Sequence, residues 1–176
     1  IHGDCSHHGK LRNYIDRFTI RFVKHFVPVA PSVKDSFVKT FGPRNNISVI
    51  NNGIDTRRLR EKASENPLCK KNLGLNSSDF IIGTIGRLHP IKRYDLLIEA
   101  FHEMSKECTN PNKIPKLCII GGGSEEKTLK ILVLKLKIQN QVIFFGERTD
   151  AYRFYPIFNC FVLSSATEGL SIALLE

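Results

Sequence analysis

The chain has 176 residues, of which 41% are hydrophobic and 24% are charged, and its formal net charge is +9. This composition is typical of globular proteins with a real hydrophobic core, and no apolar run approaches the roughly 18–20 residues that would span a bilayer. The five cysteines are scattered, without a C-x-x-C pair or zinc-ligand spacing, which favours a reducing cytoplasm over a disulfide framework.

The first predicted element is a basic amphipathic helix over residues 10–26. Its apolar residues form one helical stripe: Leu11, Tyr14, Ile15, Phe18, Phe22 and Phe26. Such a helix can bind an anionic membrane face, or it can pack its stripe into a core and expose a basic back. We favour the packed stripe, because its aromatic residues suit a core. Aromatic and basic residues are not interleaved as in RNA-binding modules, so no nucleic-acid partner is expected.

The remaining signals alternate between strand and helix. Before residue 80 they predict a strand at 26–30, a helix that Ser32 caps and that runs through Phe41, a strand at 47–50, a linker at 51–55, and a polar, basic connection at 56–78 with a short helix near 69–73. After residue 80 they predict strands at 80–85, 116–120, 141–145 and 160–163, each followed by a helix, at 93–107, 125–137, 150–156 and the end of the chain. This alternation predicts an α/β fold with a parallel, right-handed doubly wound sheet, as in Rossmann-like domains.

Two cations follow the predicted strand 80–85. Arg87 and Lys92 lie in the loop that joins this strand to the next helix. Ligands of open parallel sheets bind at the carboxyl ends of the strands, and an arginine fork with a lysine point charge is a usual partner of a diphosphate. Taken singly, each cation is more often just a solvated side chain.

A second candidate loop lies in the last nine residues, Glu168-Gly-Leu-Ser-Ile-Ala-Leu-Leu-Glu176. They follow an apolar strand signal and predict a loop that feeds a helix, whose first turn offers unpaired N–H groups to an anion. One carboxylate precedes the helix and one lies within it, an arrangement suited to a phosphate flanked by hydroxyl-rich groups. An ordinary strand–loop–helix with two solvated glutamates fits this segment equally well.

A third loop, Gly121-Gly-Gly123, resembles a phosphate cradle only superficially. It is not G-x-G-x-x-G, and no Walker lysine follows it. Strand, glycines and then Ser124-Glu-Glu126 also indicate a helix entry with a capping signal. We therefore rank a structural role for this loop first.

Five segments in order resemble one family. The stretches IGRLHPIKRYDLLIEAF (85–101) and SSATEGLSIALLE (164–176) are similar to the retaining glycosyltransferases of family 4, which have the two-domain GT-B architecture. VINNGID, KLCIIGGG and QVIFFG, at 49–55, 116–123 and 141–146, resemble further motifs of that family. Each motif is weak alone, but their common order makes a strong signal over nearly the whole chain.

The resemblance implies roles for particular residues. Arg87 and Lys92 match the diphosphate-binding cations, and Glu168 matches the glutamate that contacts sugar hydroxyls. Glu176 matches the second glutamate of that motif, which holds the ribose. Further implied contacts are backbone N–H groups of Gly169, Leu170 and Ser171 at the distal phosphate and sugar, Arg148 near the base, and His2 facing the donor sugar from the acceptor domain.

The resemblance also implies an organisation and an activity. Residues 1–55 would be the end of the acceptor domain with the linker, and 56–176 a donor-binding domain truncated at its end, so the fragment itself should turn over poorly. The implied enzyme is a retaining hexosyltransferase of polysaccharide biosynthesis that moves a sugar from a nucleoside-diphosphate sugar to a glycan or lipid-linked acceptor. The resemblance implies neither a cofactor nor a metal. It implies that the protein is located in the cytoplasm or at the inner face of the membrane. A GT-B nucleotide-sugar epimerase and a non-catalytic nucleotide-sugar-binding module stay open as alternatives.

Overall fold

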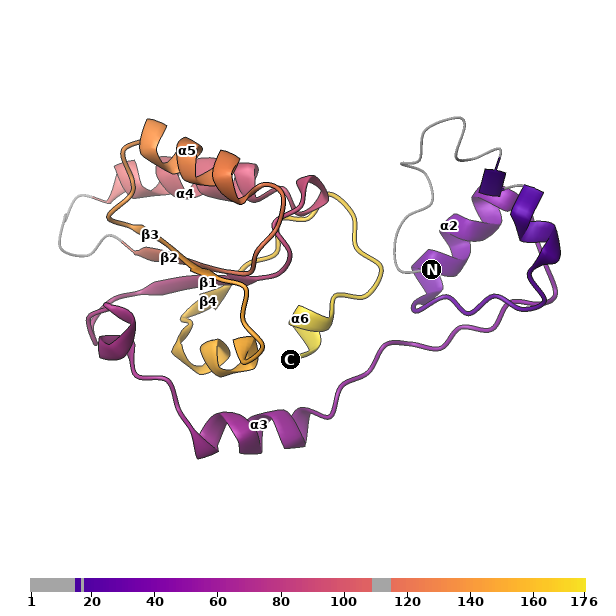
Figure 1. Ribbon diagram of the computed structural model, residues 1–176, viewed down its shortest axis with the longest axis horizontal. Helices are drawn as coiled ribbons and strands as arrows, with labels where there is room; N and C mark the ends of the chain where they lie inside the picture. The colour runs from indigo at the N-terminus through magenta and orange to yellow at the C-terminus, as the bar shows by residue number, and fades with distance from the viewer. Residues whose placement is uncertain (1–14, 17, 109–114) are drawn as a thin grey trace. The chain divides into compact units, whose positions relative to one another are not determined.

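The computed structural model describes residues 15–16, 18–108 and 115–176 and divides the chain into two compact units. Unit 1 comprises residues up to Ile54 together with Thr167–Leu175, and unit 2 comprises Asp55–Ala166 with Glu176. The units are described separately below (Figure 1). Their boundary falls within the segment expected to be the linker, while the assignment of 1–55 and 56–176 to acceptor and donor domains stays a prediction.

Unit 2 is built on a four-stranded parallel sheet, which confirms the predicted fold class. The strands stand in the order β3-β2-β1-β4 and have these bounds: β1 Ile81–Ile85, β2 Lys116–Ile120, β3 Val142–Gly146 and β4 Cys160–Phe161. The chain thus moves outward from β1 to β3 and then returns to pair β4 with the other side of β1. The strand order reverses between β1 and β4, and in doubly wound sheets ligands bind at such a switch point.

Two layers cover the sheet of unit 2. Helices α4 (Tyr94–Glu107) and α5 (Glu126–Lys135) lie on one face, and the 3₁₀ helix η6 (Ala151–Ile157) lies on the other (Figure 1). Successive strand side chains alternate between the two faces, as strand geometry requires. In β2, Leu117 and Ile119 pack under α4 and α5, while Cys118 and Ile120 pack against η6.

A ten-residue helix, α3 (Thr56–Glu65), lies where the sequence predicts a mainly irregular connection. Only the short helix near 69–73 was expected in this region, and it is present as the 3₁₀ turn η3 (Lys70–Leu73). The carboxylate of Asp55 caps α3 by accepting a hydrogen bond from the Arg58 N–H at 3.0 Å. The prediction failed because α3 has no buried residue and therefore no apolar stripe. The Asp cap followed by good helix formers is the signal that could have revealed it.

In unit 1, α2 (Pro31–Phe41) and two extended segments pack around a small aromatic core. The rings of Phe26 and Phe37 lie 4.7 Å apart, and those of Phe37 and Phe41 lie 5.0 Å apart. Helix α2 forms as predicted, except that Ala30 occupies its N-cap and Ser32 makes no cap. Proline is favoured in the first helical position, where its missing N–H costs nothing, so Pro31 fixes this start.

The strands predicted at 26–30 and 47–50 pair in parallel but form only an isolated bridge, between Phe26 and Ile47. Backbone bonds run from Phe26 N–H to Asn46 O and from Ile50 N–H to Pro28 O, at 2.8 and 3.0 Å. The next ladder bond would need an N–H at Pro28, which proline lacks. The two segments therefore pair where strands were predicted, but the missing hydrogen bond prevents a regular two-stranded ladder.

The helix predicted over 10–26 differs from expectation where it is described; residues 10–14 and 17 lie outside the described part. The chain is helical at Ile15–Asp16 and Phe18–Thr19 and ends in the 3₁₀ turn η2 (Ile20–Phe22). Phe18 and Phe22 are 63% and 74% exposed, whereas Ile20 is buried. The expectation that the aromatic stripe packs into a core is therefore wrong for these two residues.

Candidate functional site

A cavity of about 260 Å³ opens where β1, β2 and β3 end. Its lining combines glycine backbone with charged side chains: Ile85, Gly86, Arg87, Ile120, Gly121, Gly122, Glu147, Arg148 and Ala151. Two predicted site residues, Arg87 and Arg148, thus line one cavity at the carboxyl edge of the sheet. An anion held there would meet close-approaching backbone and the guanidinium group of Arg87.

The glycine loop after β2 fixes the path of the loop that carries Arg87. Gly86 N–H donates to Ile120 O and Leu88 N–H donates to Gly122 O, each at 2.9 Å. Leu88 is fully buried, so the residues on both sides of Arg87 are anchored while Arg87 itself is exposed. The glycines permit this close approach, because a Cβ at Gly121 would collide with the carbonyl oxygen of Gly86. These contacts support the structural role that the sequence favours for the loop.

Lys92 ends a tight turn that is bonded to the loop following β4. The turn is the 3₁₀ helix η4 (Pro90–Lys92), and the Nδ1 atom of His89 accepts the N–H of Ile91 at 3.3 Å. The Ser164 hydroxyl donates to Lys92 O at 2.7 Å, and Ala166 N–H donates to Ile91 O at 2.8 Å. The loops that follow β1 and β4 are thereby joined at the switch point of the sheet.

The Lys92 side chain reaches back toward Gly86. Its Cε atom lies 4.0 Å from the position that a Cβ on Gly86 would occupy. Because Gly86 lines the cavity next to Arg87, the two cations predicted to hold a diphosphate flank the same glycine. The sequence predicted this pair of cations.

An ion network that the sequence did not reveal holds Arg148. Asp150 accepts two bonds from Arg148, at 2.8 and 2.9 Å, and one from Arg153 at 2.8 Å. Arg153 also donates to Asn66 O, at 2.7 Å, just after α3. The guanidinium of Arg148 lies 5.4 Å from the ring centre of buried Phe154. Arg148 therefore borders the cavity in a fixed position, with its fork already occupied by a carboxylate.

Asp150→Asn should destabilise unit 2 by roughly 1–2 kcal/mol near neutral pH, because charge-assisted bonds from two arginines are weakened. The hydrogen bond from Arg148 lowers the pKa of Asp150 to about 2. A depressed carboxylate pKa stabilises the fold above the unfolded value of about 3.9, and this contribution is lost as the pH falls toward 2. Thermal unfolding at several pH values should therefore show a difference in unfolding temperature between wild type and variant. This difference should be constant above pH 5 and should disappear below pH 4.

The matched control for this variant is Asp95→Asn. Asp95 pairs with Arg93 at 3.0 Å in the same i, i+2 spacing, but its side chain is 50% exposed. Exposed pairs contribute less than about 1 kcal/mol. Equal destabilisation by the two variants would contradict the role assigned to the Asp150 network.

The residues predicted to contact the distal phosphate and sugar belong to unit 1. The residues that line the sheet-edge cavity belong to unit 2. Leu170 packs against Val29, Ala30 and Val33, Ser171 is buried at 9% exposure, and Glu168 is exposed. The helix that follows is short, α6 (Ile172–Leu175). Leu170 is thus anchored in the core of unit 1, while the ligand contacts predicted for Glu168, Gly169, Leu170 and Ser171 stay predictions.

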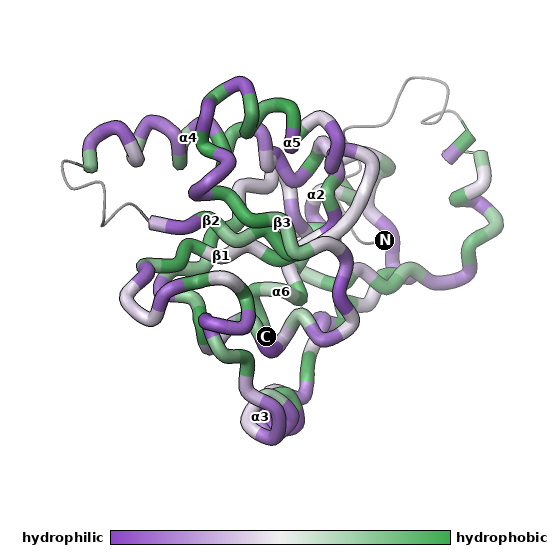
Figure 2. Tube along the Cα trace, turned by 60° about the vertical axis from the view of Figure 1, so that its left-hand side comes forward, coloured by the Kyte–Doolittle hydropathy of each residue, from purple (hydrophilic) through white to green (hydrophobic). Residues whose placement is uncertain are grey.

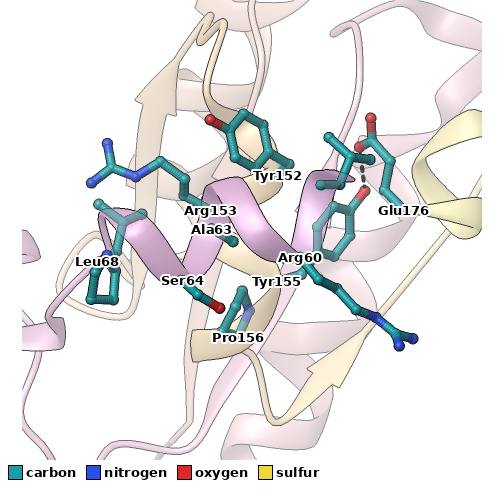
Figure 3. A pocket seen from close by; sticks show the side chains of 11 residues that line it. Arg60, Ala63, Ser64, Leu68, Tyr152, Arg153, Tyr155, Pro156 and Glu176 are labelled. Atoms are coloured by element: carbon teal, nitrogen blue, oxygen red, sulfur yellow. Dashed lines mark hydrogen bonds between the residues drawn. The ribbon is translucent and has the colours of Figure 1, made fainter. Parts of the chain in front are cut away.

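Glu176 lines a different and larger cavity, of about 360 Å³, between α3 and η6. Its carboxylate accepts the hydroxyl of Tyr155 at 3.0 Å, and burial together with this carboxylate raises the pKa of Tyr155 (Figure 3). The guanidinium of Arg60 extends away from this pair (Figure 3). Both cavities include a carboxylate, Glu147 at the sheet edge and Glu176 here, so we place the anion site at the sheet edge because Arg87 and Lys92 meet there at the switch point of the sheet. The ribose contact of Glu176 stays a prediction.

Two further expectations concern His2 and metals. His2 lies outside the described residues, so its predicted position facing the donor sugar stays a prediction. Among residues 15–16, 18–108 and 115–176, no three His, Cys, Asp or Glu side chains gather in a way that could hold a metal ion. Within the same ranges, no helix is both long and apolar enough to cross a membrane.

Comparison with known families identifies the protein family to which this sheet and its candidate site belong. The family described as "Glycosyl transferases group 1" matches residues 66–176, which is more than half of the chain and includes every strand of the sheet in unit 2. The chain belongs to this glycosyltransferase family. The resemblance inferred from the five sequence motifs is thereby confirmed.

Relatives of this glycosyltransferase chain are considerably longer than the chain itself. An uncharacterized glycosyltransferase of Methanocaldococcus jannaschii is 31% identical over 133 residues, which are 76% of this chain and 32% of the relative. The UDP-Gal:alpha-D-GlcNAc-diphosphoundecaprenol alpha-1,3-galactosyltransferase of Escherichia coli is 29% identical over 131 residues, or 74% of this chain and 33% of the relative. The chain therefore spans about a third of the length of these relatives.

Solved structures share the fold of this chain over part of their length. Anabaena Alr3699/HepE in complex with UDP and glucose aligns with a TM-score of 0.75 at 22% identity, over 94% of this chain and 45% of that one. A mutant of S. aureus TarM, in complex with Fondaparinux, alpha-GlcNAc-glycerol and UDP, aligns with a TM-score of 0.72 at 21% identity, over 98% of this chain and 33% of that one. At these identities the likeness establishes the α/β fold of the glycosyltransferase chain.

Proposed function

We propose that the protein is a retaining glycosyltransferase that moves a sugar from a nucleoside-diphosphate sugar to an acceptor, and that this chain supplies most of its donor site. The observation that carries the proposal is the pair Arg87 and Lys92 flanking Gly86 at the switch point of a sheet that belongs to the glycosyltransferase family. Similar structures in complex with UDP support this choice of ligand.

The transfer reaction requires the site to stabilise a diphosphate leaving group while the glycosidic bond breaks. Positive groups that are already in place stabilise the developing charge without reorganising at the moment of reaction. Anchoring of the backbone on both sides of Arg87, and the bonds that fix the turn before Lys92, supply this preorganisation. The two cations would contact the phosphates, and backbone N–H groups of Gly169, Leu170 and Ser171 would contact the distal phosphate and sugar.

The acceptor in this proposal is a glycan or a lipid-linked glycan. The Escherichia coli relative acts on a diphosphoundecaprenol-linked sugar according to its name. A Mycolicibacterium smegmatis relative, 26% identical over 159 residues, is named as a phosphatidylinositol monomannoside mannosyltransferase. Such acceptors lie at a membrane, so a peripheral membrane contact at the cytoplasmic face forms part of the proposal.

Calorimetry with nucleoside diphosphates and their sugar derivatives tests the proposal and separates the two glutamates. Wild-type chain should bind one nucleoside diphosphate and its sugar derivative. Glu176→Gln should weaken both ligands alike, because its proposed partner is the ribose, whereas Glu168→Gln should weaken only the sugar derivative. A single lost charged hydrogen bond corresponds to about a tenfold or larger change in Kd.

Failure has two distinct forms in this experiment. If wild type binds none of the uridine, guanosine and adenosine diphosphates, the proposed donor site is wrong. If it binds one of them but both variants weaken both ligands equally, the site stands and the division of roles between the glutamates is wrong. Circular dichroism of each variant provides the folding control.

A further inference from the structure

The outer face of α5 carries two exposed aliphatic side chains. Ile131 and Leu134 are 57% and 62% exposed, whereas Leu129 and Val133 on the other side of the helix are buried against the sheet. Their three-residue spacing places Ile131 and Leu134 next to each other on the helix surface. Hydrophobic and hydrophilic residues both occur along α5 (Figure 2). One apolar face of α5 thus serves the core and the other is presented to solvent.

Lysines surround this aliphatic pair. We define the α5 surface as the exposed residues Lys127, Lys130, Ile131, Leu134, Lys135 and Lys137. With 3.6 residues per turn, Lys127 lies between the two aliphatic residues around the helix, and Lys130 and Lys135 lie on opposite flanks. Lys130 binds Glu126 at 2.6 Å. Within the described part of the chain, the other three lysines form no ion pair, so their charges are available.

The composition of the α5 surface distinguishes between two kinds of partner. Protein interfaces are enriched in aromatic residues and arginine and depleted in lysine. The α5 surface has neither an aromatic residue nor an arginine among its six members. Aliphatic side chains flanked by lysines instead suit a lipid surface, where the apolar groups enter the headgroup boundary and the long lysine stems carry their charges to the phosphates. The observations therefore favour a membrane over a protein partner.

The neighbouring helix limits the size of this surface. The outer side of α4 carries three exposed carboxylates, from Glu99, Glu103 and Glu107. These charges oppose an anionic surface, so attraction is confined to α5 and the turn after it. A contact of one helix width should be weak and reversible, and should depend strongly on the anionic lipid fraction.

We propose that the α5 surface docks the protein on an anionic membrane, with Ile131 and Leu134 inserted at the interface and Lys127, Lys135 and Lys137 over lipid phosphates. This inference rests on the proposed function in one respect, since it gives an enzyme acting on lipid-linked acceptors a surface for reaching them. Its geometry is independent of the donor site, because it uses none of the residues at the sheet edge.

Vesicle co-sedimentation of the full chain tests the proposal. The probes are phosphatidylcholine vesicles with and without roughly a third of phosphatidylglycerol, and wild type should bind only the anionic ones. Lys127→Gln with Lys135→Gln should weaken binding about 25-fold, since each lysine near an anionic surface contributes about fivefold. Ile131→Ser with Leu134→Ser should weaken it roughly tenfold. All four residues are exposed, so these variants should keep the wild-type unfolding temperature.

Matched controls locate the contact on α5. Leu96→Ser removes an aliphatic residue of α4 that is 47% exposed, and Lys39→Gln removes an exposed lysine of α2; neither should change binding by more than about twofold. The proposal is overturned if wild type does not bind anionic vesicles, if the α5 variants bind like wild type, or if only Phe18→Ser with Phe22→Ser abolishes binding. Donor affinity, measured separately by calorimetry, should be unchanged in the α5 variants, so failure here leaves the glycosyltransferase proposal intact.

Discussion

Gly121→Ala should lower the stability of unit 2 by roughly 3 kcal/mol or more, through a backbone clash and a strained conformation together. The added Cβ would strike the carbonyl oxygen of Gly86, which is main chain and cannot rotate away as a side chain would. Gly121 also has a φ of 142°, which residues with a side chain rarely adopt. Relief requires the β1 and β2 loops to separate, which breaks the bonds that anchor Gly86 and Leu88. Chemical denaturation monitored by circular dichroism measures the change.

Gly146→Ala is the control for the conformational part of this effect. Gly146 ends β3 with a φ of 70°, and among the described residues no atom lies within 4 Å of its added Cβ. Strain alone should cost about 1 kcal/mol. If Gly121→Ala were no worse than Gly146→Ala, the close packing of the two loops that positions Arg87 would be contradicted.

Hydrophobic periodicity predicted most of unit 2, because its elements bury one face each. Strand β2 spans the predicted residues, and the start and end of α4 and β1 deviate by a residue at most. Helix α3 was missed for the same physical reason, since a solvated helix leaves no apolar period to detect. Its stability comes from the Asp55 cap, from charge pairs such as Arg57 with Glu61, and from the bond between Arg153 and Asn66.

In unit 1 local signals were less reliable than in unit 2. Ser32 and Pro31 both indicate a helix start, and only the structure shows that proline takes the first helical position. The aromatic stripe around Phe18 and Phe22 has a period that fits burial. These two rings are nevertheless exposed, and their centres lie 5.6 Å apart. Periodicity shows that a helix has an apolar face, but that face is buried only where a neighbouring element packs against it.

Motif position predicted the cations of the candidate site but could not reveal their partners. Arg87 and Lys92 follow β1 directly, so the strand prediction alone brings them to the sheet edge. The bond from Ser164 to Lys92 joins residues 72 apart in sequence, and Asp150 was not singled out in the sequence as the partner of Arg148. Long-range pairings of this kind have no local signature. The hydrogen bond of Glu176 with Tyr155 was missed for the same reason.

Removing either cation of the proposed phosphate site should weaken nucleoside-diphosphate binding about tenfold or more. Arg87→Ala and Lys92→Ala each remove a charged hydrogen bond of roughly 1.5–3 kcal/mol. The double variant should lose up to about 100-fold, and less if the two cations share one phosphate, since contacts in one network are not additive. Isothermal titration with the nucleoside diphosphate that binds wild type measures each Kd.

Arg93→Ala is the matched control, because it removes the same charge from the residue next to Lys92. The Arg93 guanidinium is bound to Asp95 at 3.0 Å, and its side chain is 45% exposed. If the phosphates are held by direct contact, this variant should stay within about twofold of wild type, since an exposed charge outside the site acts only through a screened field. Equal losses in all three variants would show that net charge alone draws the ligand, and unchanged affinity in Lys92→Ala would remove Lys92 from the site. Because Ser164 bonds to the backbone carbonyl of Lys92, the turn should survive either substitution, and unchanged thermal unfolding would confirm that only the contact is lost.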